Sequence, residues 1–489
     1  MIDQKKELTY QYACKHYLRT KSLEKLRAYG RSIGVNRSTA KNKGDLIDDI
    51  VGVLSGRLEP QFTKKGAPVL NGTVDPEIPQ RIKMIYEEIF EVKLKEDHFA
   101  EEYQKLMQSP NRILIEEPDF ELRENGAVFA KKKGQLTQIQ GVYYLLPLDG
   151  KDNGEHVVLH AELMERNALL EGDVVVCDAL QGKNAFVAST VLEINGESIQ
   201  TFRRENTLER LPCEPTRSLS IYDGVNANFV SCKYLEWLAP IRKGQRCCVI
   251  APPKTGKSRL LQELAQSARA LNPDVEISAL LIDQPLETVG CFARFLPAEN
   301  LFYTTYEDEV ERQVFLADFI LKRAKRFAES GKDVVLFVDS FQALGKAFND
   351  TDESMGGKTL PCGLESKTLQ YLKKYLGAAR CDGGKGTLTI IGTATTDTGN
   401  PFDDVIAAEI APILNHEIRL SAEMAYKRLY PALDRTQIYV ERRELSAEER
   451  MQDELINKYL QQVGAEKLLH AVLQSADRAE VEKRIKTAL

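Results

Sequence analysis

The stretch APPKTGKS, residues 251–258, decides the fold of this chain. An apolar segment at 245–250 precedes it, and the helix-forming run SRLLQELAQSARAL follows it. A strand, a tight loop and a helix in this order surround a phosphate group with backbone N–H groups. In such a loop Lys257 reaches the β- and γ-phosphates, and the Ser258 hydroxyl binds Mg²⁺. Ala251 replaces the usual first glycine, which leaves a chance GKS in a turn as the alternative; the context favours a site for ATP and Mg²⁺.

A second strand ends in an acid about eighty residues further on. The segment DVVLFVDS, residues 333–340, places Asp339 at the carboxyl end of an apolar run. A P-loop enzyme uses an aspartate in that position as a second contact to Mg²⁺. Many strands end in an aspartate that binds no metal. The assignment of Asp339 as a Mg²⁺ contact therefore rests on its position after a phosphate loop.

The surrounding pattern alternates strands and helices after about residue 240. The apolar segments RCCVIA, EISALLID, DVVLFVD and LTIIGTA are short and continuous, as strands buried on both faces are. Between two of them, the segment from about 308 to 329 repeats apolar residues at three- and four-residue steps, which predicts an amphipathic helix. We therefore expect a parallel sheet covered by helices on both faces.

The sequence pattern changes between residues 112 and 202, where short segments of alternating apolar and polar residues are separated by Gly, Asp and Asn turns. About five strands in ninety residues predict a small barrel of the OB or cold-shock type. Such barrels bind single strands by stacking bases on exposed aromatic rings. Tyr143 and Tyr144 are the candidates, and because neighbouring strand residues face opposite sides, at most one of them is a platform. The alternative is that both are ordinary core or edge tyrosines.

The two ends of the chain have a helical pattern. Residues 6–58 predict a small helical module, and its segment 11–43 carries nine Lys or Arg against one acid, Glu24. Such a basic module fits either a nucleic-acid contact or a solvated helical face. Residues 59–108 read as a Pro- and Gly-punctuated linker followed by an inserted charged helix, and residues 446–489 as helices.

Composition narrows the class of protein further. No apolar run approaches the length of a membrane span, and the first residues lack the apolar core of a secretory signal. Nine cysteines without C-x-x-C spacing and six scattered histidines favour neither a disulfide framework nor a zinc module. The net charge is −6. These features predict a cytoplasmic protein in a reducing compartment, with no membrane partner.

The segment from about 205 to 445 resembles transcription termination factor Rho, the ring-shaped RNA-dependent ATPase of bacteria. The resemblance rests on GQRCCVIAPPKTGKSRLLQELAQS, ALLID, KDVVLFVDS, LGAAR, GTLTIIGTATTDTG and KRLYPALD. It implies a multidomain chain with a RecA-like α/β P-loop domain, an OB or cold-shock-like β-barrel and a small N-terminal helical module. It also implies a homo-hexameric ring with ATP between neighbouring domains, single-stranded RNA in the centre, and the RNA polymerase complex as a partner.

Several residues take roles from this resemblance, position by position. Asp339 would support the metal, and Tyr430 would replace a phenylalanine that stacks near the adenine. Arg428 would lie near the subunit boundary, with a plain surface arginine as the alternative. Lys358, in GGKT, would touch RNA from a central pore loop, with a mobile loop lysine as the alternative. The residues expected to bind phosphates and Mg²⁺ are Lys254, Thr255, Gly256, Lys257 and Ser258.

The chain departs from the family pattern where the chemistry takes place. Gln284 aligns with the water-activating glutamate, and an amide takes no proton at neutral pH. Glu287 matches a later acid of that motif and would substitute only if the turn slipped. The trans arginine finger aligns with Glu441, although Arg435, Arg442 or Arg443 would compensate if the loop shifted.

The groups that would contact RNA also differ from the family. The second pore-loop lysine aligns with Pro401. In the barrel, the family's Gly-Phe-Gly-Phe-Leu-Arg run reads Gly141-Val142-Tyr143-Tyr144-Leu145-Leu146.

Two functions follow from these departures, and the sequence leaves both open. The first is a working Rho-type termination factor, in which RNA-dependent ATP hydrolysis drives translocation and transcript release; it needs another carboxylate, such as Glu287 or Asp283, and a relocated arginine. The second is a hydrolysis-defective paralogue that binds ATP and RNA as a regulatory or structural protein, alone or in mixed rings with a catalytic relative. A RecA-like motor for another polymer is disfavoured by the barrel.

Overall fold

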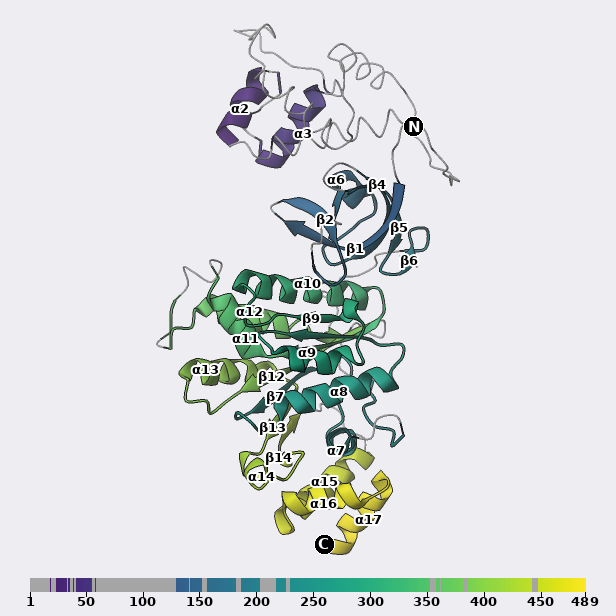
Figure 1. Cartoon of the computed structure of the whole chain (residues 1–489), viewed down its shortest axis with the longest axis vertical. Helices are drawn as coiled ribbons and strands as arrows, with labels where there is room; N and C mark the ends of the chain where they lie inside the picture. The colour runs from purple at the N-terminus through teal and green to yellow at the C-terminus, as the bar shows by residue number, and fades with distance from the viewer. Residues whose placement is uncertain are drawn as a thin grey trace. The chain divides into compact units, whose positions relative to one another are not determined.

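The computed structural model divides the chain into two compact units, which we describe separately (Figure 1). The first unit comprises Met1–Pro147, Asp152–Leu169 and Val175–Thr201, and the second comprises Leu148–Lys151, Leu170–Val174 and Phe202–Leu489. The structure describes residues 18, 23–32, 34–35, 38, 41–54, 58, 129–139, 141–151, 156–181, 186–202, 217–225, 229–351, 358–360, 362–381, 386–441 and 447–489. The predicted linker at 59–108 and the first predicted barrel strand, near 112–118, lie outside these residues.

Two helices of the first unit form the predicted N-terminal module. They are α2 (Leu23–Ser32) and α3 (Lys43–Leu54), and they pack on each other. Leu26 of α2 meets Leu46 and Ile50 of α3 in a small core in which all three side chains are at most 1% exposed. The apolar residues of the two helices therefore face each other in this core, which is why so short a segment folds as a helical pair.

The rest of the first unit is a closed barrel. Its sheet runs in the order β3-β2-β1-β4-β5-β6, and a further pairing of β3 with β5 closes it. The helix α6 (Ala161–Arg166) follows β3 along the chain. The strands are β1 (Phe129–Ile139), β2 (Val142–Leu146), β3 (Val157–Leu159), β4 (Val174–Gln181), β5 (Phe186–Ile194) and β6 (Glu197–Ser198). The predicted OB or cold-shock type of barrel is confirmed.

One strand of the barrel differs from the prediction. The sequence predicts separate strands in GAVFAKK and TQIQGVYYLLPL, whereas β1 runs without a break from Phe129 to Ile139. Gly134 permits this continuity, because a Cβ there would lie 2.6 Å from the backbone oxygen of Leu146 on β2. The close backbone approach needs glycine, so the glycine marks a tight strand contact and not a turn.

The second unit contains the predicted parallel sheet. Its strand order is β14-β13-β7-β12-β10-β8-β9, and β11 pairs with β12 beside this path. All neighbours along the path are parallel except β13 and β14, which are antiparallel. The strands are β7 (Arg246–Ala251), β8 (Glu276–Leu281), β9 (Leu301–Tyr303), β10 (Asp333–Asp339), β11 (Arg380–Cys381), β12 (Thr387–Thr395), β13 (His416–Leu420) and β14 (Leu433–Val440).

Helices cover both faces of this sheet (Figure 1). One group contains α7 (Val230–Leu238), α8 (Lys257–Leu271) and α9 (Leu286–Ala293). The other group contains α10 (Val310–Glu329), α11 (Phe341–Asn349), α12 (Ser366–Leu376) and α13 (Pro401–Ile410). The shorter elements are α14 (Ala422–Tyr426) and the 3-10 turns Ala298–Asn300 and Ala411–Ile413. The RecA-like α/β architecture expected from the sequence is confirmed.

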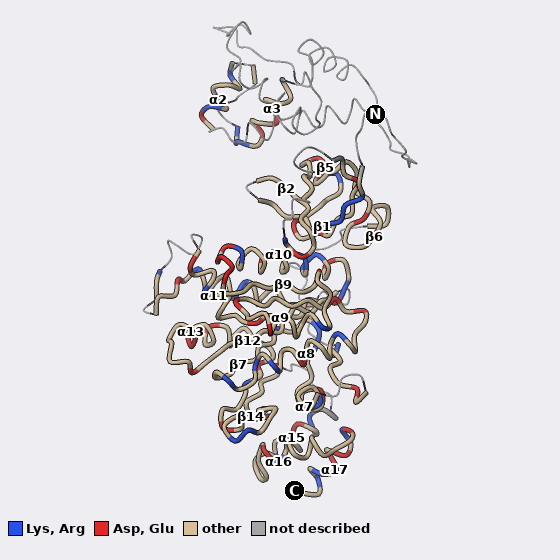
Figure 2. The backbone as a smooth tube through the Cα atoms, viewed as in Figure 1, with Lys and Arg blue, Asp and Glu red and all other residues tan. Residues whose placement is uncertain are grey.

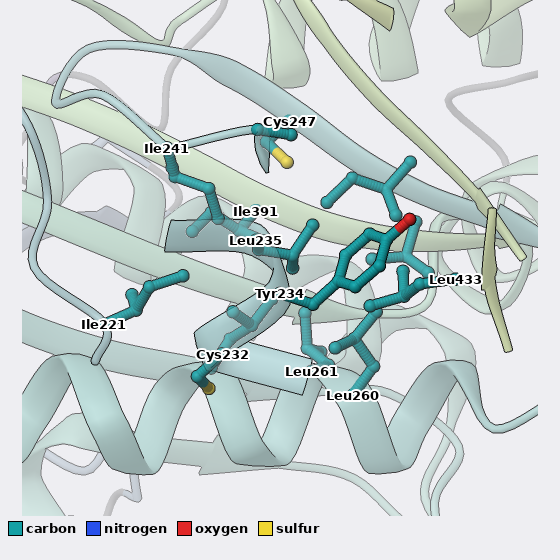
Figure 3. Close-up of a cluster of buried hydrophobic side chains, with 14 of the residues drawn as sticks. Ile221, Cys232, Tyr234, Leu235, Ile241, Cys247, Leu260, Leu261, Ile391 and Leu433 are labelled. Carbon is teal, nitrogen blue, oxygen red and sulfur yellow. The ribbon is translucent and has the colours of Figure 1, made fainter. Parts of the chain in front are cut away.

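The core of the second unit explains why the central strands are apolar throughout. Cys247 and Cys248 of β7 point to opposite faces, as predicted, and both are fully buried. On one face Cys247 belongs to the cluster that Leu260 and Leu261 of α8 and Tyr234 of α7 complete (Figure 3). A strand covered on both sides has no polar face, so alternation is absent from its sequence.

Three helices end the chain: α15 (Ala447–Gln462), α16 (Ala465–Gln474) and α17 (Arg478–Ala488). The helix α16 contacts α7 and β14. Lys233 of α7 donates a hydrogen bond to the backbone oxygen of Ser475, just after α16. No helix in the described part of the chain is both long and apolar enough to cross a membrane.

We predict that Gly392→Ala destabilises the second unit. A Cβ at Gly392 in β12 would lie 2.3 Å from the Phe341 ring, so the ring or the strand must move, at about 1–3 kcal/mol. Urea unfolding followed by the fluorescence of Trp237, the single tryptophan of the chain, measures the change.

Gly290→Ala in α9 is the matched control. A Cβ there meets no atom within 4 Å, and alanine is the better helix residue, so we expect unchanged or slightly raised stability. Equal midpoints for the two variants would contradict the tight packing of β12 on Phe341.

Candidate functional site

The phosphate loop lies between β7 and α8, as the sequence predicts. Lys254 and Gly256 have positive φ values of 62° and 99°, and these curl the backbone around the helix N-terminus. The buried Thr255 closes the loop, since its Oγ1 donates a 2.7 Å hydrogen bond to the Pro252 oxygen. Lys257 and Ser258 then start α8 and are half-buried. The first backbone N–H groups of a helix have no partner within it, so this end of α8 suits an anion.

A groove of about 530 Å³ adjoins this loop. Tyr430 lines it, and its ring lies 3.9 Å from the point where a Cβ on Gly256 would be. Leu260 and Leu420 supply apolar walls, and Phe229 and Ser231 line the side of α7. The Tyr430 side chain is 54% exposed, so its ring is available to a planar ligand. The groove therefore has the size and lining for a nucleotide base next to its phosphates.

Asp339 ends β10 at the same edge of the sheet. It is 1% exposed, and its Oδ1 accepts a 2.6 Å hydrogen bond from the Thr393 hydroxyl of the neighbouring strand β12. Its Oδ2 is buried and has no hydrogen-bond partner among the described residues. A buried carboxylate oxygen without a donor is costly unless a cation or water meets it. The Asp339 carboxylate and the Ser258 hydroxyl are oxygen ligands, which are the ligands that Mg²⁺ prefers.

Gln284 lies just after β8. Two residues before it, the Ile282 N–H donates a 2.8 Å hydrogen bond to the backbone oxygen of Asp339. The backbone turns at Asp283, whose φ is 56°, and the Gln284 N–H then bonds to the Thr304 oxygen at 3.0 Å. The Gln284 amide nitrogen donates to the Ile282 oxygen at 3.3 Å. The amide is thus oriented by its own strand, and its carbonyl oxygen can accept a hydrogen bond from water but not take a proton.

Glu287 does not take the place of the missing glutamate. The turn has not slipped, because the N–H groups of Thr288 and Val289 bond to the Pro285 oxygen and start α9 there. Glu287 is in the first turn of this helix and is exposed. Its carboxylate is therefore a solvated helix-end group in the described structure.

Glu441 lies at the opposite edge of the sheet from the phosphate loop. Its N–H bonds to the Asn415 oxygen at 2.8 Å, and the Asn415 side chain accepts from the N–H of Arg246, the first residue of β7. The phosphate loop begins only after the last residue of β7, a distance of about 17 Å along the strand. Glu441 therefore cannot reach the phosphates of its own chain.

The arginines considered as substitutes for the finger do not lie free in this region. Arg435 donates to the backbone oxygens of Leu238 at 3.0 Å and Ile438 at 2.9 Å, so it holds β14 against α7. Asp453 of α15 approaches the same guanidinium at 3.7 Å. Arg442 and Arg443 lie outside the described residues.

Arg428 and Lys358 are both exposed. Arg428 follows α14, at the end of β13 that lies beside the phosphate loop, because Arg419 pairs with Ile250 in the sheet. Lys358 is held through its backbone, which exchanges hydrogen bonds with Ser366 at 3.0 and 3.1 Å. Residues 352–357, the rest of that predicted pore loop, lie outside the described part of the chain.

Pro401 stands at the first position of α13, where Asn400 caps the helix by accepting from the Phe402 N–H. The acids Asp403 and Asp404 occupy the first turn, and Asp404 accepts the N–H of Asp397 from the preceding loop. The position that the resemblance assigns to a pore-loop lysine is therefore Pro401, and two carboxylates follow it. These groups stabilise the helix start but repel a phosphate backbone.

The two barrel tyrosines separate as expected for adjacent strand residues. Tyr143 pairs with Leu159 and shares the inner face of β2 with the buried Leu145. Tyr144 lies on the other face, half-buried, with its ring edge-on to His156 at 5.5 Å. Only Tyr144 is placed to meet a ligand from outside the barrel.

Some site residues escaped the sequence analysis. Thr393, which orients Asp339, lies within the segment GTATTDTG. The sequence could have indicated it, because a threonine on a strand next to one that ends in an acid can donate a hydrogen bond to that acid. Ser231 and Phe229 join the groove only because α7 packs on α8, which no local pattern shows. The described residues contain no group of three His, Cys, Asp or Glu side chains that could hold a metal ion by themselves.

The chain is similar to one family model and to several solved structures. Residues 231–439 match the model of the ATP synthase alpha/beta family, nucleotide-binding domain. Among solved structures, an ATPase of the type III secretion system of pathogenic bacteria is similar at a TM-score of 0.46, with 21% identity over 57% of this chain and 86% of that one. The assembled ATPase EscN of enteropathogenic E. coli also has a TM-score of 0.46, with 17% identity over 74% of this chain and 98% of the other.

Curated relatives are more similar in sequence. Transcription termination factor Rho of Chromobacterium violaceum is 32% identical over 353 residues, which cover 68% of this chain and 82% of that protein. The Rho proteins of Bacillus subtilis and Haemophilus influenzae are 32% and 36% identical, over 70% and 60% of their own lengths. The chain therefore belongs to the transcription termination factor Rho family.

Proposed function

We propose that this protein is a Rho-type factor that binds ATP, Mg²⁺ and single-stranded RNA as a ring and hydrolyses ATP very slowly. The observation that carries this proposal is Gln284, whose amide occupies the strand end where a water-activating carboxylate belongs and is hydrogen-bonded to Ile282. The binding groups around it are complete. A protein of this kind acts through nucleotide-dependent assembly on a transcript.

The nucleotide would bind along one edge of the sheet. Its phosphates would contact the loop from Lys254 to Ser258, and Mg²⁺ would lie between the Ser258 hydroxyl and Asp339. The base would stack on Tyr430 in the groove. The phosphate and metal contacts are made by backbone N–H groups, lysine and oxygen ligands, and they do not depend on Gln284 or Glu441.

Hydrolysis lacks two groups in this arrangement. General-base catalysis contributes about 10²–10⁴-fold, and the exposed Glu287 does not replace the base that Gln284 fails to provide. An arginine finger adds about 10³–10⁵-fold in other NTPases. In a ring, Glu441 would approach a neighbour's phosphates, because its own lie at the far end of β7, and a carboxylate there would oppose the developing negative charge.

A working motor is the second candidate. The exposed Arg428 beside the phosphate loop is the observation in its favour. The phosphate loop and the unpaired Oδ2 of Asp339 serve both candidates, since both bind Mg·ATP. The motor would require that Gln284 orient water without accepting its proton, and that Arg428 or an arginine at 442–443 act across the subunit boundary.

The remaining assignments follow the family. We infer a homo-hexameric ring in the cytoplasm, or a mixed ring with a catalytic relative, that acts on the RNA polymerase complex. The proposed domains are 6–58, 59–108, 112–202, 205–445 and 446–489. Tyr144 and Lys358 are the proposed RNA contacts. Tyr143 is the weaker candidate, because it shares the inner face of β2 with Leu145.

Lys257→Ala is expected to weaken ATP binding about 10- to 100-fold, the value of a lost charge-assisted contact. Titration with a fluorescent ATP analogue in Mg²⁺ measures it. Lys458→Ala, which removes an exposed lysine of α15, is the control and should bind like the wild type. Equal affinity for both variants would contradict the phosphate-loop assignment.

RNA-stimulated ATPase activity separates the two candidate functions. We expect wild-type turnover well below ~1 s⁻¹, the low end of ordinary enzyme rates, with Lys257→Ala as background. The double variant Gln284→Glu, Glu441→Arg should raise turnover at least tenfold, because it restores the base and the finger. Wild-type turnover of ~1 s⁻¹ or more would establish the motor and exclude the slow-hydrolysis proposal.

Tyr144→Ala is expected to weaken binding of a labelled single-stranded RNA by about 1–3 kcal/mol, the worth of one stacked base. Fluorescence anisotropy measures the affinity. Tyr426→Ala removes an 88% exposed tyrosine of α14 and serves as the control. If wild-type protein binds RNA and Tyr144→Ala binds equally well, Tyr144 is not an RNA contact.

A further inference from the structure

The helix α11 starts directly after Asp339 and brings a buried amide to the carboxyl edge of the sheet. Gln342, in its first turn, is 8% exposed. Its Nε2 donates a 2.9 Å hydrogen bond to the backbone oxygen of Thr395, the last residue of β12. The N–H of Thr396 bonds to Ala251 of β7, so the Thr395 oxygen faces the other side, where β10 has already ended. The Gln342 amide therefore satisfies a backbone oxygen that no strand reaches.

This contact fixes the direction of the amide. If the amide were turned over, its Oε1 would face the Thr395 oxygen, and two acceptors would oppose each other. With Nε2 on Thr395, the Oε1 atom of Gln342 is buried and has no hydrogen-bond partner among the described residues. A buried acceptor without a donor is costly, so a bound species that donates a hydrogen bond to this oxygen would stabilise the site.

A second oxygen of the same kind lies nearby. The Oδ2 of Asp339 is also buried and without a donor in the described part of the chain. Lysines and arginines are spread over the second unit, in blue in Figure 2, yet none of those described donates to either oxygen. A hydrated cation matches this pair, because its waters donate hydrogen bonds and its charge opposes that of the carboxylate.

The strand β12 sets the spacing of the two oxygens. Thr393 donates to Asp339, and Thr395, two residues further along the same strand, accepts from Gln342. These two contacts are about 7 Å apart. Mg²⁺ binds oxygen at about 2.1 Å and keeps several waters, each of which donates over about 2.8 Å. An oxygen on the ion and a second oxygen that accepts from one of its waters are thus up to about 7 Å apart, which agrees with the spacing.

We propose that Gln342 is a positioning residue for Mg²⁺ in the nucleotide site: its Oε1 accepts a hydrogen bond from a water on the ion, while Asp339 contacts the ion itself. This inference rests on the ATP- and Mg²⁺-binding function proposed above and adds a residue to it. The role is independent of hydrolysis, because neither Gln284 nor Glu441 takes part. Loss of such an outer partner costs about 10–100-fold in metal affinity.

The test compares the affinity of the full-length protein for a fluorescent ATP analogue in Mg²⁺ and in EDTA. The ratio of the two dissociation constants measures how much the metal strengthens nucleotide binding. Gln342→Met keeps the length of the side chain but removes the acceptor, so the ratio should fall about tenfold while binding in EDTA is unchanged. Gln342→Glu provides a charged acceptor and should raise the ratio.

Gln313→Met is the matched control. Gln313 of α10 is 7% exposed and also donates to a backbone oxygen, that of Asp308. Because α10 follows β9, two strands away from β10 in the sheet, this variant should keep the wild-type ratio. Urea unfolding verifies that each variant is folded.

The outcomes separate this role from a structural one. If Gln342→Met keeps the wild-type ratio, or weakens binding equally in Mg²⁺ and EDTA, Gln342 only supports β12, and the inference is wrong while ATP binding stands. Should Gln342→Met fail to fold, Gln342→Glu decides alone, and an unchanged or lower ratio overturns the inference. If the wild type binds no nucleotide, or binds it equally in Mg²⁺ and EDTA, the proposed metal site fails as well.

Discussion

Parallel pairing of β7, β12, β10 and β8 is the constraint on which the rest of the structure depends. Because these strands run in one direction, their carboxyl ends meet at one edge, and the loops that leave them are neighbours. The phosphate loop, Asp339 and Gln284 all follow such ends. The same direction sends the amino ends to the opposite edge, where Asn415 ties Glu441 to the start of β7. The sheet thus places the phosphate loop, Asp339 and Gln284 at one edge and Glu441 at the other.

The functions assigned to the two edges of the sheet differ in how much sequence change they tolerate. Phosphate binding depends on backbone N–H groups and on the φ angles of Lys254 and Gly256, so it persists as long as the loop keeps its shape. Proton transfer and charge stabilisation depend on single side-chain groups, so in the proposed function one amide at Gln284 and one carboxylate at Glu441 are enough to remove them. A chain can therefore lose hydrolysis without losing ATP. The acids Asp397, Asp403 and Asp404 around Pro401 extend the same pattern to the proposed RNA path, since they stabilise a helix start and repel phosphate.

The barrel combines retained shape with altered surface. Its inner residues Leu136 and Leu145 hold the strands together, and Val142 and Leu146 on the outer face of β2 are buried as well. On the outer face a single ring remains, that of Tyr144.

The sequence by itself determined the type of each part. The run APPKTGKS, the strand ends at Asp283 and Asp339, and the alternation of residues 112–202 are local patterns, because backbone geometry and burial impose fixed periods of two and 3.6 residues. It misjudged β1, because Gly134 marks a backbone contact that only the partner strand reveals. Which side chains meet was decided by the tertiary structure alone. Packing of α7 on α8 completed the base groove, the Thr393 hydroxyl oriented Asp339, the helix start at Pro285 exposed Glu287, and the length of β7 separated Glu441 from the phosphate loop. Such relations join residues far apart in the chain, and their distances are set by strand order and register, which no short stretch of sequence contains.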